Sequence, residues 1–271
     1  MFEEMRSRFV LGWMMGASLV AIFILLQATG NVLIISLAMQ LVFYIVLPVW
    51  LCSYHFKKRG LKLRQVIFFR GTERWLMPVF GLTVLVMAFS MTIYWLMMRA
   101  LMSVAPAAVQ FAFTTQPLPD ALWYLVTTGF IVAVIAPVAE EFVFRGLILT
   151  RLVEIFGLWR GLGLSSLIFG IFHINFFSAF LFAIVASLLY LKTGNLLVPI
   201  LLHAANNSVA VYQSFVNPSF PEWLMVTSVK DLYTKSMPNL VVLALSITLL
   251  LFFITRMSQG LENKIKENRL S

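Results

Sequence analysis

Long apolar stretches dominate this chain and decide what it can fold into. A helix that crosses a bilayer needs roughly 20 consecutive, mostly apolar residues. Eight such stretches can be laid out: 9–28, 31–53, 75–98, 122–138 continuing to about 155, 161–177, 178–191, 196–212 and 238–255. Only 11% of the 271 residues are charged, against about 25% in a soluble domain. We therefore expect an all-α, polytopic integral membrane protein with about eight transmembrane helices.

The connections between these stretches are too short to hold a soluble domain, so residues 1–271 are expected to form a single membrane domain. Residues 9–28 follow basic residues, as the apolar part of a signal peptide would, but no convincing cleavage site of small residues follows. We interpret them as a retained first span. The chain has one cysteine, Cys52, which excludes an internal disulfide and a cysteine-based metal cluster.

The net charge of +9 is distributed as expected for a membrane protein. With a cytoplasmic N-terminus and eight spans, 16 basic residues fall on the cytoplasmic side and 3 on the opposite side, while Arg145 remains within the membrane. This is the asymmetry of the positive-inside rule. We expect a multi-pass protein of the plasma membrane with both termini in the cytoplasm. Nucleic acid is not an expected partner, because no basic patch is interleaved with aromatic residues.

Two adjacent glutamates and an arginine interrupt the fourth stretch, in VIAPVAEEFVFRGLILTRL (residues 134–152). A charge at the centre of a span costs roughly 2.5–3.5 kcal/mol on insertion scales, so charges at this depth indicate function. On an α-helix Glu141 and Arg145 share a face, in the favourable order for an ion pair. Glu140 points about 100° away and is left free for chemistry. Alternatively, both acids lie only among lipid headgroups, because residue 140 comes late in its span.

His173, in IFGIFHINFF, is about twelve residues into the fifth stretch and is therefore expected near mid-bilayer on a helix. Phe169 lies four residues earlier on the same helix face, where it could wall a site. A solitary histidine on a buried helix is more often a hydrogen-bonded packing residue. His173 does not indicate catalysis by itself.

His203 and Asn207, in LLHAANNS, are four residues apart and project from one face of the seventh stretch. Asn206 points elsewhere and could assist helix packing, as amides in membranes do. The His203–Asn207 pair could also serve only as a hydrogen-bonded link between helices. In the expected topology, however, Glu140, His173 and this pair lie on three helices that can converge on one polar site in the cytoplasmic half of the membrane.

Glutamate and histidine in such a site can activate water. A carboxylate in a water-poor environment holds a proton more readily than in bulk water, so it can take a proton from water and pass it to a leaving amine. A histidine N–H and an asparagine amide on one helix face can donate to the oxygen that becomes negative in a tetrahedral intermediate. The expected reaction is hydrolysis of a peptide bond without a covalent acyl-enzyme.

Three short motifs on successive apolar stretches resemble those of a known family. EEFVFR fits E-E-x-x-x-R, FGIFH fits F-x-x-x-H, and HAANN fits H-x-x-x-N, in that order. Together with TGNLLVPILLHAANN, they resemble the CPBP family, the CAAX-protease and bacteriocin-processing intramembrane proteases, also called the Abi family. The resemblance covers about residues 120–212, an expected catalytic core. The N-terminal helices at about 9–98 and the last helix at about 238–255 match only in being hydrophobic.

The resemblance implies an intramembrane endopeptidase in which Glu140 and His173 activate the water. It implies that His203 and Asn207 form the oxyanion hole and that Glu141 and Arg145 support the site. The implied partners are membrane lipid and a polypeptide substrate at or in the membrane. Eukaryotic members trim prenylated CAAX proteins, whereas many prokaryotic relatives process peptides, confer bacteriocin immunity or act as scaffolds.

Three alternatives stay open at this point. No cofactor is expected, but Glu140, His173 and His203 are also a known type of zinc ligand set. A non-catalytic scaffold or immunity protein would bind another membrane protein and need no turnover. A transporter could use Glu140 and His173 as a proton relay, although the repeated halves typical of transporters are not evident in the sequence.

Overall fold

The structure is a computed structural model that describes residues 16, 20, 31–59, 62–114 and 118–263. Within these ranges every regular element is helical, which confirms the all-α class. In the described part of the chain, five helices are long and apolar enough to cross a membrane: Val32–Tyr54, Thr72–Leu101, Leu122–Phe156, Phe176–Thr193 and Ser236–Ser258. The protein is therefore integral to a membrane. Apart from residues 16 and 20, the predicted span at 9–28 lies outside the described residues.

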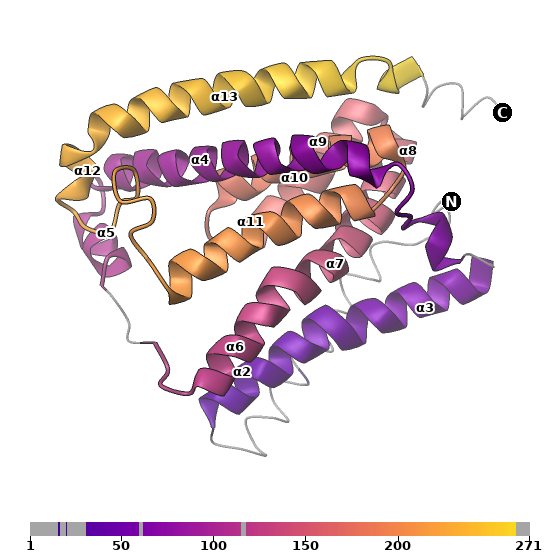
Figure 1. Cartoon of the computed structure of the whole chain (residues 1–271), viewed down its shortest axis with the longest axis horizontal. Coiled ribbons are helices and arrows are strands. Elements are labelled where there is room, and N and C mark those ends of the chain that lie inside the picture. The colour runs from indigo at the N-terminus through magenta and orange to yellow at the C-terminus, as the bar shows by residue number, and fades with distance from the viewer. Residues whose placement is uncertain (1–15, 17–19, 21–30, 60–61, 115–117, 264–271) are drawn as a thin grey trace.

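Most helices run between two ends of the molecule (Figure 1). Helices α2 (Val32–Leu41) and α3 (Leu47–Arg59) continue one another and pack against the long helix formed by α6 (Leu122–Phe130), α7 (Ala136–Glu141) and α8 (Thr150–Phe156). Helix α13 (Ser236–Ser258) packs along α4 (Leu76–Leu101). Helices α9 (Leu158–Ile171), α10 (Phe176–Thr193) and α11 (Leu197–Phe215) lie between these two groups of packed helices.

Helix α10 lies at the centre of the core because its contact face carries small side chains. Ala179, Ala183 and Ala186 are at most 8% exposed and pack with residues of α4, α11 and α13 in one apolar cluster. Small side chains allow helix backbones to approach closely in membranes. Helix α10 therefore fixes how α9 and α11 sit relative to each other.

The predicted span 161–177 is wrong in its second half. Helix α9 ends at Ile171, and residues 172–175 form a turn before α10. The turn forms because Asn175 caps α10, with its side chain accepting a hydrogen bond from the Ser178 amide at 3.4 Å. His173 therefore lies in a turn and not on a helix.

The turn lies beside the middle of helix α4. Helix α9 has 14 residues, which is about 21 Å of helix, and the hydrocarbon core is about 30 Å thick. The Asn175 amide donates to the Ser90 carbonyl at 3.2 Å, and Ser90 lies near the middle of α4. The mid-bilayer depth expected for His173 stays a prediction.

Helix α11 is long enough to span but is absent from the five strongly apolar helices. Its polar side chains, including His203, Asn206 and Asn207, lower its mean hydropathy. Polar groups at this depth need partners within the protein. Helix α11 packs against α7 and the segment Ile131–Ile135 before it, which supply Glu141 as the partner of His203 and the Val132 carbonyl as that of Asn207.

The start of α11 is held by a buried asparagine. Asn195 is 2% exposed, and its amide donates to the Phe68 carbonyl at 2.7 Å and to the Thr72 hydroxyl at 2.9 Å. The Leu196 amide also donates to the Val66 carbonyl at 2.9 Å. The segment before α4 is thereby fixed to the first turn of α11.

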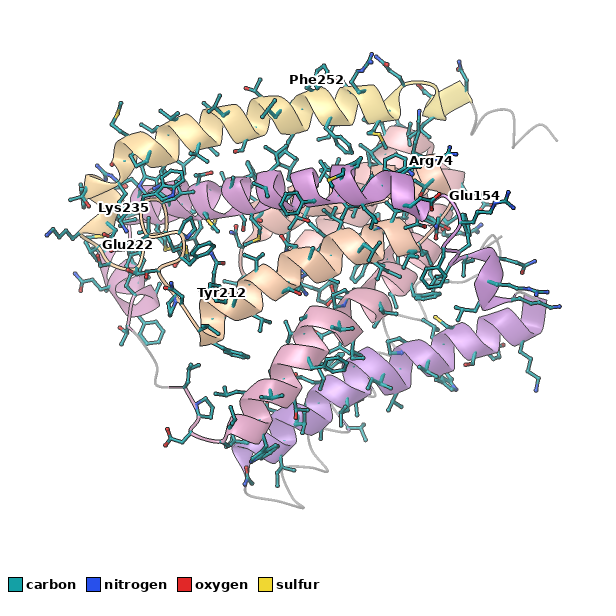
Figure 2. The ribbon with its side chains drawn as sticks, in the orientation of Figure 1. Arg74, Glu154, Tyr212, Glu222, Lys235 and Phe252 are labelled. Carbon is teal, nitrogen blue, oxygen red and sulfur yellow. The ribbon has the colours of Figure 1, made fainter. Side chains whose placement is uncertain are left out.

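Basic side chains gather at the end of the molecule where α4 and α11 begin and α13 ends. In Figure 2 Arg74 and Glu154 lie at this end, whereas Glu222 and Lys235 lie at the opposite end. Exposed basic residues of this end are Lys62, Arg64, Arg70, Arg74, Lys192 and Arg256. We call it the basic end; α6 begins at the opposite end, and α8 ends at the basic one.

Candidate active site

Glu141 is the best-connected charge inside the protein. Its side chain is fully buried, and its Oε1 atom lies 2.7 Å from His203 Nδ1 and 2.8 Å from Arg145 Nη1. The ion pair with Arg145 confirms the prediction from the i, i+4 spacing. The contact with His203 joins α7 to α11 and was not predicted. A carboxylate that accepts from Nδ1 leaves Nε2 of the ring facing away from Glu141.

Arg145 lies between Glu141 and two aromatic rings. Its side chain is 1% exposed, and the carbon of its guanidinium is 4.5 Å from the Phe169 ring centroid and 5.6 Å from that of Phe182. Ring faces attract a cation, and this attraction is stronger when water is excluded. The contact of Arg145 with Glu141 is an ion pair whose angles do not meet those of a hydrogen bond. Arg145 therefore neutralises Glu141 and fixes the position of Phe169.

Glu140 is placed differently from its neighbour. Its side chain is 17% exposed, and Oε2 lies 3.9 Å from His203 Nε2. Among the described residues, Oε2 has no hydrogen-bond partner although it is buried. A buried carboxylate oxygen needs a partner, and a separation above 3.5 Å between two polar groups suits a water that contacts both. Glu141 is thus closely paired, whereas Glu140 has only the longer contact with His203.

His173 approaches the cluster from the α9–α10 turn. Its Nδ1 atom is 2.8 Å from the Phe169 carbonyl oxygen, and because that oxygen can only accept, Nδ1 carries the proton of this bond. In the neutral ring Nε2 is then a proton acceptor. The ring stacks on Phe169 with centroids 4.4 Å apart. Phe169 also contacts the His203 ring edge-on at 5.9 Å, so it lies against both histidines, as its predicted role as a wall requires.

Asn207 is one helical turn beyond His203 and faces α7 and the segment before it. Its Nδ2 atom donates to the Val132 carbonyl at 2.9 Å, and its Oδ1 accepts from Asn206 Nδ2 at 3.4 Å. An acceptor facing the nitrogen and a donor facing the oxygen fix the orientation of the amide. One N–H of the amide is used by Val132, and the other is available to a ligand.

The structure therefore brings most of the predicted site residues into one cluster. Glu140 and Glu141 both contact His203, and Glu141 also contacts Arg145. Phe169 joins His173 to them, and Asn207 is held one turn away on α11. Val132 and Phe182 were not predicted. An apolar residue in a sequence does not indicate that its carbonyl will accept a hydrogen bond or that its ring will lie beside a cation.

A zinc site requires three ligands around one point. In the part of the chain that the structure describes, no group of three His, Cys, Asp or Glu side chains is placed to hold a metal ion. Glu140, His173 and His203 as they lie do not fit that ligand set.

The fold and the cluster define a polytopic helical membrane protein with a buried carboxylate–imidazole site between three core helices. Residues 122–209 match the family model of the type II CAAX prenyl endopeptidase Rce1-like proteins. The matched segment contains all three motifs, so the family resemblance predicted for about residues 120–212 is confirmed. A comparison with curated proteins and one with solved structures each gave no significant match.

Proposed function

We propose that this protein is an intramembrane endopeptidase that hydrolyses peptide bonds of membrane-associated polypeptides. The family match supports a CAAX-protease-like peptidase at the level of the family. The single observation that carries the proposal is the state of Glu140. Its Oε2 atom is buried, lacks a hydrogen-bond partner among the described residues and faces His203 Nε2 at 3.9 Å. A general base needs such a free carboxylate beside the position of its water.

In the proposed reaction a water bound between Glu140 and His173 attacks the carbonyl carbon of the substrate. Glu140 takes the proton of this water, and Nε2 of His173 accepts a hydrogen bond from it. The carbon–nitrogen bond then breaks, and Glu140 passes the proton to the leaving amine. The products are a carboxylate and an amine, and no group of the protein is acylated.

His203 and Asn207 are the proposed donors to the oxygen that becomes negative. Because His203 Nδ1 is occupied by Glu141 at 2.7 Å, the proposed donor of the ring is Nε2. Arg145 balances the charge of Glu141. The second N–H of Asn207 is the other donor. Removing one donor of an oxyanion hole typically lowers kcat about 10²- to 10³-fold.

The proposed substrate is a polypeptide held at or in the membrane. We infer that His173 lies within the bilayer because α9 is short and the turn after it contacts the middle of α4. Glu140 lies on a helix that continues to the basic end. By the positive-inside rule the basic end faces the cytoplasm, so we propose cleavage in the cytoplasmic half of the plasma membrane. Identification of the substrate will show whether it carries a lipid.

Glu140→Gln tests this function. We expect the variant to insert normally and to lose all detectable cleavage, because the amide cannot take a proton from water. Glu154→Gln is a matched control, since Glu154 is on the same long helix but pairs with Arg151 at the basic end. Membrane peptides that accumulate with Glu140→Gln and not with Glu154→Gln identify the substrates. If processing is the same in wild type and both variants, the protein is a non-catalytic scaffold and the proposal is wrong.

A further inference from the structure

The helix that carries the two glutamates is interrupted just before them. Residues Ile131–Ile135 form a π-helical segment, in which each N–H bonds to the carbonyl five residues back. The N–H of Ala136 follows this pattern and bonds to the Ile131 carbonyl. The next N–H in the series would come from residue 137 and would bond to the Val132 carbonyl. Residue 137 is a proline and has no N–H.

Pro137 therefore leaves the Val132 carbonyl without its partner in the helix. The proline ring also crowds the preceding turn and keeps it open. A free carbonyl inside a membrane protein requires a donor from elsewhere. That donor is Asn207 of α11, whose amide nitrogen lies 2.9 Å from the Val132 oxygen.

We infer that Pro137 is a positioning residue that orients Asn207 by freeing the Val132 carbonyl. This inference rests on the proposed function, in which the second N–H of Asn207 contacts the oxyanion. An asparagine on α11 can adopt several rotamers, and the bond to Val132 selects one of them. Pro137 itself is buried and has no polar side-chain group that could bind a substrate.

A second proline in the chain has the same local arrangement and provides a control. Val42–Val46 is also π-helical, the Leu47 N–H bonds to the Val42 carbonyl, and residue 48 is a buried proline. Pro48 thus frees the Phe43 carbonyl in the same way. Within the described ranges no side chain donates to Phe43. The proline and the π-helical turn are matched, and only the asparagine partner differs.

The test compares Pro137→Ala, Pro48→Ala and Asn207→Ala in the full-length protein. Alanine at 137 supplies an N–H and lets the turn close on Val132, so Asn207 loses its fixed orientation. We expect kcat to fall between about tenfold and about a hundredfold in Pro137→Ala, with KM changed little, because a small misplacement of a catalytic donor has this effect. Pro48→Ala should retain the wild-type kcat within about twofold.

The double variants separate positioning from a general effect on the fold. If Pro137 acts through Asn207, Pro137→Ala adds no further loss of kcat in the Asn207→Ala background, whereas Pro48→Ala behaves additively. An unchanged kcat in Pro137→Ala, or an equal loss in both backgrounds, overturns the inference.

Thermal unfolding of the same variants provides a measurement that does not depend on activity. Asn207→Ala should lower the apparent Tm less in the Pro137→Ala background than in wild type, since the bond to Val132 is already lost there. Equal decreases in both backgrounds also overturn the inference. If the wild-type protein cleaves no peptide but this coupling is present, the proposed function fails and the link between Pro137 and Asn207 stands.

Discussion

The strongest test of the cluster is the replacement of Glu141 by glutamine, which removes one charge and almost no volume. Glu141 has no exposed surface, and its Oε1 atom is shared by His203 at 2.7 Å and Arg145 at 2.8 Å. The variant leaves the Arg145 cation buried without its counter-charge. Removing one partner of a buried ion pair costs about 3–5 kcal/mol. We therefore expect the free energy of unfolding of Glu141→Gln to fall by this amount.

Glu140→Gln is the matched variant, because it makes the same chemical change one residue away. The Glu140 side chain is 17% exposed, and its contact with His203 is 3.9 Å long. Such a partly exposed, loose contact contributes less than about 1 kcal/mol. The apparent Tm of Glu141→Gln should therefore lie on the order of 10 °C below that of Glu140→Gln, although only Glu140→Gln removes the proposed base.

The single cysteine makes the assay simple. Cys52 is half-buried in the folded protein, so a thiol-reactive fluorescent dye reports unfolding as the temperature rises. Replacing Arg145 by Met in the Glu141→Gln variant removes the unpaired cation and should restore part of the lost Tm. Equal Tm values for Glu140→Gln and Glu141→Gln, or a further loss on adding Arg145→Met, would refute the division of roles between the two glutamates.

Two further predictions concern metal and pH. Peptide cleavage should persist after the purified protein is treated with a chelator, because in the proposed mechanism Glu140 and His173 act on water directly; activity that is lost and then restored by Zn²⁺ would contradict this. At the end opposite the basic end, burial alone would raise the pKa of Asp231, but hydrogen bonds from Thr227 and the Lys235 ammonium hold that pKa below its ordinary value. This carboxylate therefore stabilises the loop before α12 (Asp231–Thr234) above its unfolded pKa of about 3.9, and the contribution is lost as pH falls through the lower folded value. Limited proteolysis across a pH series should show this acid transition in wild type and not in Asp231→Asn; identical profiles would exclude the role of Asp231.

The sequence by itself determined those features that depend on the spacing of residues along a single helix. Apolar length predicted the spans that the structure describes at 32–54, 72–101, 122–156, 176–193 and 236–258. The spacing of four residues predicted the Glu141–Arg145 ion pair and left Glu140 apart from it. Such inferences hold because helix geometry fixes which side chains share a face, whatever surrounds the helix.

The tertiary structure decided which faces meet. It paired Glu141 with His203 across two helices, directed Asn207 to a carbonyl freed by a proline, and ended α9 two residues before His173. The two contacts do not follow from local spacing, because each depends on how α10 packs α11 against the long glutamate-bearing helix. The motifs supplied the reactive groups, and the packing of three helices decided their distances.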